Sequence, residues 1–145
     1  MAETSVITCL ACAQANRVPA DRLAQRPKCG TCGAALLPLK PVEVDLSTLR
    51  KASTTDQLPL LVDFWAPWCG PCRAMAPEFE KAAALLQGEA RLAKIDTERS
   101  PEASARWNIR GIPAFVVFRN GREVARLAGA RPAAQLADWV RQAVS

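Results

Sequence analysis

The stretch VDFWAPWCGPC, residues 62–72, decides the fold of this chain. The run from Leu60 to Trp65 is apolar except for Asp63, and Pro59 and Pro67 bound it. That length between two prolines predicts a buried strand. Beyond this stretch, apolar residues recur every three or four positions, which predicts a helix. The two cysteines therefore lie where a strand ends and a helix begins, and a Cys-x-x-Cys at that point indicates a redox dithiol.

The placement of the dithiol predicts its chemistry. Cys69 lies at the first helical turn, where free backbone N–H groups and the helix dipole favour negative charge and lower the pKa of a thiol. Cys72 follows three residues later on the same face, so it can attack a mixed disulfide formed by Cys69. Pro71 fixes one φ angle and lacks an N–H, which a first turn tolerates.

The resolving thiol must lose a proton, and the chain contains neither histidine nor tyrosine to accept it. Carboxylates and lysines remain as candidate bases. Asp63 lies inside an apolar run, so we expect its carboxyl group to be desolvated, with a raised pKa. A buried acid near a dithiol is a candidate general base, acting directly or through water. The alternative is a structural aspartate paired with a lysine.

The motif Trp68-Cys69-Gly70-Pro71-Cys72, with Val62-Asp63-Phe64-Trp65 before it and Gly111-Ile112-Pro113 after it, resembles the thioredoxin family. The resemblance covers about residues 42–145. It implies an α/β thioredoxin fold, in which helices flank a central mixed β-sheet, and the activity of a cytoplasmic protein-disulfide reductase. The implied partners are an NADPH-dependent thioredoxin reductase and oxidised protein substrates.

The resemblance also implies roles for single residues. Lys94 matches the lysine that pairs with the buried aspartate, although an exposed strand lysine is the commoner reading of such a position. Pro113 matches the cis proline that faces the dithiol, whose loop binds the substrate backbone. Ala114 stands where threonine is common in the family. The expected substrate-binding surface comprises Trp68, Gly70, Pro71, Ile112, Pro113 and Gly129.

Two further Cys-x2-Cys pairs, separated by sixteen residues, precede this region. The spacing fits a four-cysteine zinc site in which each pair wraps one turn around the metal. The predicted ligands are Cys9, Cys12, Cys29 and Cys32. Two disulfides or an iron centre are the alternatives, and the absence of histidine excludes mixed Cys/His sets. Residues 1–40 resemble the cysteine-rich extension of the thioredoxin 2 type found in bacteria.

The chain is expected to divide into a zinc-binding ribbon with a short connection, residues 1–40, and a thioredoxin domain, residues 41–145. So small a ribbon cannot bury a useful core and would need its metal to fold. Gly30 and Gly33 are expected to let backbone N–H groups approach the thiolates, while the first pair lacks such glycines. Leu36, Leu37 and Leu39 are too apolar for a free linker, so we expect them to dock.

The periodicity and the turn signals predict the remaining elements. The Asn120-Gly121 pair predicts a tight hairpin. Strands are expected at 42–44, 60–66, 91–96, 115–118 and 123–128, and helices from 45 or 47 to 52 and at 69–87, 100–106 and 132–144.

Composition narrows the function. The net charge of +5 is spread along the chain without an aromatic-interleaved basic stripe, so we expect no nucleic-acid partner. No run approaches the roughly 20 apolar residues of a membrane helix, and Met1 to Thr8 lacks the pattern of a secretory signal. We therefore expect a cytoplasmic monomer with one zinc ion and no tightly bound organic cofactor. The competing hypothesis is a zinc-dependent binding or chaperone module in which the dithiol is secondary.

Overall fold

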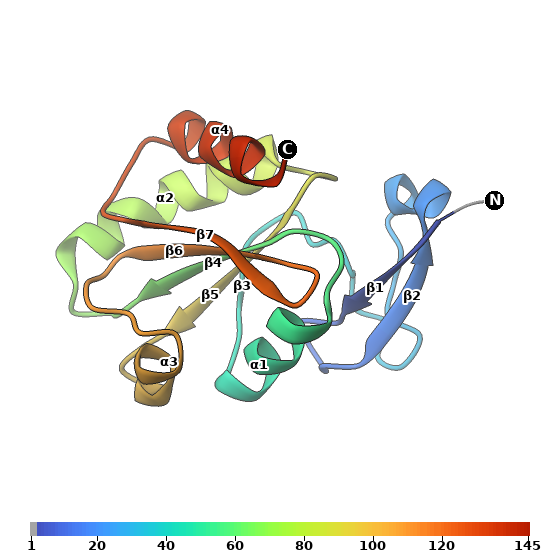
Figure 1. The fold of residues 1–145 in the computed structure, drawn as a ribbon, viewed down its shortest axis with the longest axis horizontal. Helices are drawn as coiled ribbons and strands as arrows, with labels where there is room; N and C mark the ends of the chain where they lie inside the picture. The colour runs from blue at the N-terminus through green and yellow to red at the C-terminus, as the bar shows by residue number, and fades with distance from the viewer. Residues whose placement is uncertain (1–2) are drawn as a thin grey trace.

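The computed structural model describes residues 3–145 and contains a five-stranded sheet with a small two-stranded ribbon beside it (Figure 1). The first two residues of the segment inspected for a secretory signal, Met1 to Thr8, lie outside the described residues. None of the described helices is long and apolar enough to cross a membrane.

The main sheet has the strand order β3-β5-β4-β6-β7. Strand β4 lies at its centre, parallel to β5 and antiparallel to β6, so the sheet is mixed, as the family resemblance implied. Every residue of β4 up to Phe64 is buried, which explains its nearly continuous apolar sequence. The bounds of the strands are β3 Val42–Glu43, β4 Leu60–Trp65, β5 Arg91–Asp96, β6 Ala114–Arg119 and β7 Arg122–Ala128.

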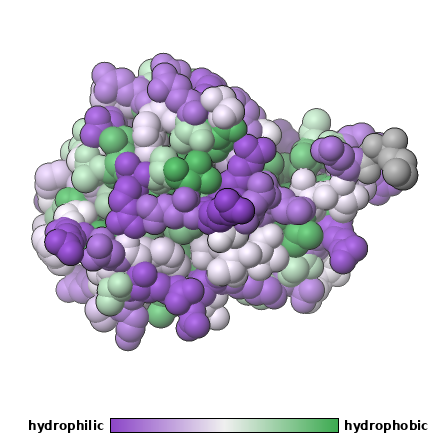
Figure 2. Space-filling view, in the orientation of Figure 1, coloured by the Kyte–Doolittle hydropathy of each residue, from purple (hydrophilic) through white to green (hydrophobic). Residues whose placement is uncertain are grey.

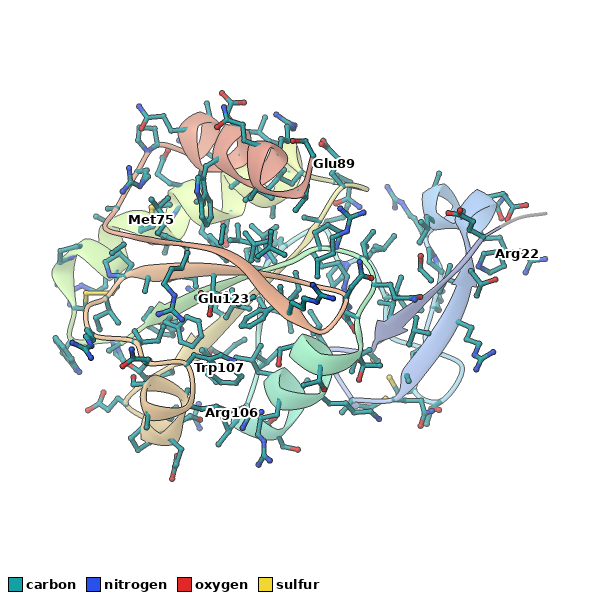
Figure 3. All side chains as sticks on the ribbon, viewed as in Figure 1. Arg22, Met75, Glu89, Arg106, Trp107 and Glu123 are labelled. Carbon is teal, nitrogen blue, oxygen red and sulfur yellow. A yellow bond between two sulfur atoms is a disulfide. The ribbon has the colours of Figure 1, made fainter. Side chains whose placement is uncertain are left out.

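Helices cover both faces of the sheet: α2 and α4 lie on one side, α1 and α3 on the other (Figure 1). Each side has its own hydrophobic core, one centred on Phe79 and Phe115, the other on Phe64 and Leu49. Trp107, partly buried, packs against the second of these cores between α3 and the sheet (Figure 3). The helices are α1 Leu46–Thr55, α2 Gly70–Leu85, α3 Pro101–Arg106 and α4 Ala133–Val144.

The ends of the helices and the hairpin turn lie close to where the sequence predicted them. Asp45 caps α1 by accepting a 2.8 Å hydrogen bond from the Thr48 N–H, but the helix runs to Thr55 rather than ending at 52. Ser100 occupies the N-cap position of α3 without a side-chain hydrogen bond. Asn120 and Gly121 adopt φ values of 54° and 77° and close the β6–β7 hairpin as predicted.

The ribbon consists of β1 Thr4–Thr8, antiparallel to β2 Ala15–Pro19, and a short 3₁₀ helix, Ala20–Gln25. It packs against α1 at one end of the long axis of the molecule (Figure 1). The face shown in Figure 2 is mainly hydrophilic, and its hydrophobic residues are grouped in small separate areas.

Hydrogen bonds attach the ribbon to the sheet domain. The Thr8 N–H donates to Asp56 Oδ1 at 2.7 Å, and the Gln57 N–H donates to the carbonyl of Val6 at 3.0 Å. Arg91, at the start of β5, donates to the carbonyls of Thr8 at 2.8 Å and Leu36 at 3.1 Å. The ribbon is therefore fixed at the edge where β4 and β5 begin.

The connection between the two parts is only partly docked. Leu36 and Leu37 are buried as predicted, but Leu39 is 54% exposed, so the prediction that all three leucines dock was wrong for the third. Proline residues flank Leu39 at positions 38 and 41, and the chain bends at residues 39 and 40. Leu10, in the first cysteine pair, lies in the core beneath α1.

Candidate active site and metal centre

The dithiol lies at the start of α2, where Cys69 is the N-cap residue and joins Cys72 in a disulfide. The Cys72 N–H donates to the Cys69 sulfur at 3.2 Å. Both side chains are at most 5% exposed, and Ala66 and Ile112 pack against them. A sulfur at this position is stabilised as a thiolate by the free N–H groups and the dipole of the helix.

The surface around the sulfurs contains the residues expected to meet a substrate. Trp68, directly before the dithiol, is 67% exposed. The Ile112–Pro113 peptide bond is cis, and the carbonyl oxygen of Ile112 lies 3.9 Å from the Cys69 sulfur. Gly129 donates its N–H to the Pro113 carbonyl at 2.9 Å, which ties the end of β7 to the proline loop. Gly70 and Pro71 are exposed in the first turn of α2.

Asp63 is completely buried in β4, and neither of its carboxylate oxygens has a hydrogen-bond partner within the described chain. Burial raises the pKa of this carboxyl group to about 7; the charge of Lys94 lowers the pKa, and the charge of Glu43 raises it further. The group can therefore gain and lose a proton near neutral pH.

Lys94 lies beside Asp63 across the β4–β5 ladder. Its ammonium group sits 4.5 Å from the centre of the Trp65 ring, a distance typical of a cation–π contact. Among the described residues, no ion pair within 4.0 Å includes Lys94. The lysine thus acts on the aspartate through its field and not through a direct salt bridge.

The four cysteines of the ribbon converge at the other end of the molecule, with all sulfurs within 4.8 Å of one another. The Cys9–Cys32 and Cys12–Cys29 sulfur pairs are each 3.6 Å apart. A tetrahedral zinc site with Zn–S bonds of about 2.3 Å has S–S edges of about 3.8 Å, so the donor set fits zinc. The separations are much longer than the roughly 2.05 Å of a disulfide.

The two cysteine loops have the same hydrogen-bond pattern. The N–H groups of Ala13 and Gly33 donate back to the carbonyls of Cys9 and Cys29, at 2.8 and 2.9 Å. Both donors have positive φ values, 68° for Ala13 and 80° for Gly33. The first loop therefore adopts the left-handed conformation without the glycine that normally accommodates it.

Hydrogen bonds lower the pKa of one of the four thiols. The backbone N–H of Cys32 and the side chain of Asn16 hold the pKa of Cys29 at about 6. The Thr31 N–H donates to the same sulfur at 3.4 Å, whereas the Gly30 N–H donates to the Asn16 side chain at 3.0 Å. The expected approach of amides to thiolates occurs, but Gly30 is not the donor.

Sequence reasoning missed two groups of residues. One is the buried ion pair of Asp56 and Arg91 at the ribbon junction. The other is Glu43, which accepts hydrogen bonds from the Trp65 indole N–H and the Asp96 N–H. Only the alternation along 42–44 hinted at a polar side chain on the α2 face of β3, and nothing in the sequence indicated its partners.

Comparisons with known proteins agree with this architecture. The thioredoxin family model matches residues 41–142, and the model described as "Thioredoxin 2, N-terminal" matches residues 8–34. Thioredoxin C-3 of Corynebacterium nephridii is 43% identical over 137 residues, 94% of each chain. Thioredoxin 1 of a Nostoc species is 37% identical over 100 residues, 69% of this chain and 94% of the relative.

Solved structures show the same fold. Chloroplastic thioredoxin z has a TM-score of 0.66 and 32% identity, and the match covers 72% of this chain and 95% of that one. A mutant thioredoxin of Halobacterium salinarum has a TM-score of 0.66 and 30% identity, with 74% and 94% covered. The chain therefore belongs to the thioredoxin family as a thioredoxin-type protein-disulfide reductase, with the N-terminal zinc ribbon of thioredoxin 2 ahead of its thioredoxin domain.

Proposed function

We propose that Cys69 and Cys72 are the catalytic dithiol of a protein-disulfide reductase. In the reduced protein, the Cys69 thiolate attacks a substrate disulfide, forms a mixed disulfide and releases the first substrate thiolate. The Cys72 thiolate then attacks the Cys69 sulfur, releases the second substrate thiolate and leaves the Cys69–Cys72 disulfide. Two electrons pass to the substrate, and two protons complete its thiols.

The observation that carries this proposal is the position of the dithiol at the N-terminus of α2, next to the exposed Trp68 and the Ile112 carbonyl. Trp68 offers apolar area for an extended substrate segment. Ile112, Pro113 and Gly129 form the other side of the binding surface, and Gly70 and Pro71 form its floor.

Asp63 is proposed as the base that accepts the proton of Cys72, directly or through water. A pKa of about 7 suits that role, because the group can take up the proton at neutral pH and release it in the next step. Lys94 supports the ionised carboxylate through its positive charge.

The remaining roles follow from the family. Thioredoxin reductase, supplied with NADPH, would restore the dithiol, and the substrates would be oxidised proteins in the cytoplasm, which the chain meets as a monomer. The four cysteines of residues 1–40 would hold one zinc ion, and no organic cofactor is required. The ribbon would modulate activity or partner choice. Because it is fixed at the end of the molecule opposite the disulfide, it would not touch the bound substrate (Figure 1, Figure 3).

The test of the reductase role is NADPH-coupled reduction of a protein disulfide in the presence of thioredoxin reductase. Cys69→Ser should abolish turnover, and Cys72→Ser should accumulate the mixed disulfide, visible by mass spectrometry of the intact adduct. Turnover that survives Cys69→Ser would contradict the proposal.

The zinc role has a separate test. Native mass spectrometry of the reduced protein should give one zinc per chain before treatment with one equivalent of peroxide. Loss of zinc afterwards would assign a redox-responsive module, and retention would assign a structural one. A chain without zinc would refute the metal site and leave the reductase assignment intact.

A further inference from the structure

Three charged side chains lie side by side across three adjacent strands. Glu43 of β3 pairs with Lys94 of β5, and Lys94 pairs with Asp63 of β4. Residues that pair in register across parallel strands point to the same face of the sheet. One lysine therefore lies between two carboxylates, on the face that α2 covers.

Both carboxylate oxygens of Glu43 are occupied. Oε1 accepts a 2.9 Å hydrogen bond from the Trp65 indole N–H, and Oε2 accepts a 2.9 Å hydrogen bond from the Asp96 N–H. These two donors come from the ends of β4 and β5, so the carboxylate is held at a fixed place although it belongs to a two-residue edge strand.

The Trp65 ring connects Glu43 with the lysine. Its N–H edge binds Glu43, and its face carries the Lys94 ammonium at 4.5 Å. Trp65 also packs against the cluster formed by Ala66, Cys69 and Cys72. Glu43 thus fixes the plane of a tryptophan that holds the lysine on one side of the dithiol.

The charges around Asp63 can be named for each neighbouring element. Strand β5 contributes Lys94, strand β3 contributes Glu43, and on β6 the residue that pairs with Asp63 is the uncharged Phe115. Helix α2 contributes the two cysteines. Asp96 acts on Glu43, whose pKa burial raises while Trp65 opposes that effect. Glu43 and Lys94 are thus the neighbouring charges with opposite effects on Asp63.

We propose that Glu43 is a positioning residue for the dithiol reaction: it holds Trp65 against Lys94 and shares the charge of that lysine, and so sets the pH at which Asp63 exchanges its proton. This inference rests on the proposed role of Asp63 as the base. Without the negative charge of Glu43, the lysine acts on Asp63 alone, and the aspartate ionises at lower pH.

Glu43→Gln is the informative variant, because it removes the charge and keeps an amide oxygen that can accept the Trp65 hydrogen bond. Glu43→Ala removes both the charge and the contact. Glu80→Gln is the matched control, since Glu80 is an exposed glutamate on α2. The full-length, zinc-loaded protein is used throughout.

The first measurement is the titration of the Asp63 carboxyl carbon by NMR in oxidised protein labelled at aspartate, with the signal assigned by its loss in Asp63→Asn. The midpoint should fall in Glu43→Gln and Glu43→Ala and stay in place in Glu80→Gln. An unchanged or higher midpoint in the two Glu43 variants would overturn the inference. A residue that only anchors the edge strand would not move this signal in Glu43→Gln.

The second measurement is the pH dependence of single-turnover disulfide reduction by the pre-reduced protein. In Glu43→Gln, the rate at pH 6 relative to the plateau should rise about two- to threefold over wild type, because more Asp63 is ionised there. If the rate of Asp63→Asn still falls at acidic pH as the wild-type rate does (the acid limb of the profile), Asp63 is not the base and the proposed mechanism fails. If Asp63→Asn loses the limb and Glu43→Gln leaves it in place, only the role of Glu43 is wrong.

Discussion

Asp56 and Arg91 form an ion pair whose side chains are each 1% exposed, at the junction between the ribbon and the sheet. Arg91 also binds the carbonyl next to a cysteine of the metal site, and Asp56 binds the N–H of the same residue, Thr8. The pair is therefore the polar centre of the contact between the two parts of the chain.

Replacing one partner of this pair should be costly. Asp56→Asn keeps the shape and leaves Arg91 buried without its counter-charge, so we expect the free energy of unfolding to fall by about 3 kcal/mol or more. Glu89→Gln, which breaks the exposed pair of Glu89 with Arg141, should cost at most about 1 kcal/mol. Urea denaturation of the zinc-loaded protein measures both, and equal losses would contradict the importance of the junction.

Leu10 offers an apolar test of the same contact. Its side chain is 6% exposed and lies in the core beneath α1, so Leu10→Ala should destabilise the protein by about 2–4 kcal/mol. Leu39→Ala is the control, because that leucine is mostly exposed and should change stability by less than about 0.5 kcal/mol. A ribbon that merely rests on the surface would give two equally small effects in thermal unfolding.

Substitutions at the left-handed residues of the two cysteine loops should change stability in opposite directions. Ala13→Gly should stabilise the zinc-loaded protein by up to about 1 kcal/mol, since glycine adopts a φ of 68° without a Cβ clash. Gly33→Ala should destabilise it by a similar amount, although no atom lies within 4 Å of the added Cβ. Competition with a zinc chelator and urea denaturation would measure the changes. If both variants were stabilised, or both destabilised, the left-handed backbone would not be the cause.

The pKa of Asp63 predicts how stability depends on pH. The folded chain holds this proton up to about pH 7, whereas the unfolded chain releases it near pH 4. The contribution of Asp63 to stability is therefore largest below pH 4 and falls as the pH rises to 7, by on the order of 4 kcal/mol. Asp63→Asn should remove this loss, which makes the oxidised variant more stable than wild type at pH 8 and comparable at pH 4.

Denaturation of the oxidised protein at the two pH values checks this prediction. Asp21→Asn is the control, because Asp21 is exposed and its replacement should act equally at both. A wild-type stability that rises from pH 4 to pH 8 relative to Asp63→Asn would contradict the assigned direction.

Features set by local sequence could be predicted. The apolar run ending at the CGPC motif predicted the central strand and the position of the dithiol, and the Asn120-Gly121 pair predicted the hairpin. The spacing of the Cys-x2-Cys pairs anticipated four converging sulfurs. The strand, the dithiol and the hairpin each depend on residues within one element or one turn, and the four-cysteine site combines two such turns whose spacing fits one metal.

Features set by contacts between distant parts could not be predicted. The pairing of Glu43 with Lys94 requires the strand order, which places β3 next to β5, although β4 comes between them in the chain. The Asp56–Arg91 pair joins the end of a helix to the start of a strand thirty-five residues later. Leu39 is a residue for which the local pattern was misleading: the apolar segment around it predicted docking, but its side chain is exposed.

The burial of Leu10 among sheet-domain residues limits how this protein can be rearranged. The loop that carries the first two cysteines of the ribbon also fills part of the reductase core through Leu10. The ribbon has a small buried cluster of its own as well, around Ile7, Val18 and Leu36, contrary to the expectation that it could bury no core. A ribbon transplanted onto another member of the family would have no matching contact surface unless that host also supplied counterparts of Asp56 and Arg91. Conversely, a lineage that lost the ribbon would have to fill the space of Leu10 and replace the hydrogen bonds between the ribbon and the Asp56–Arg91 pair, so its loss would require several coordinated substitutions.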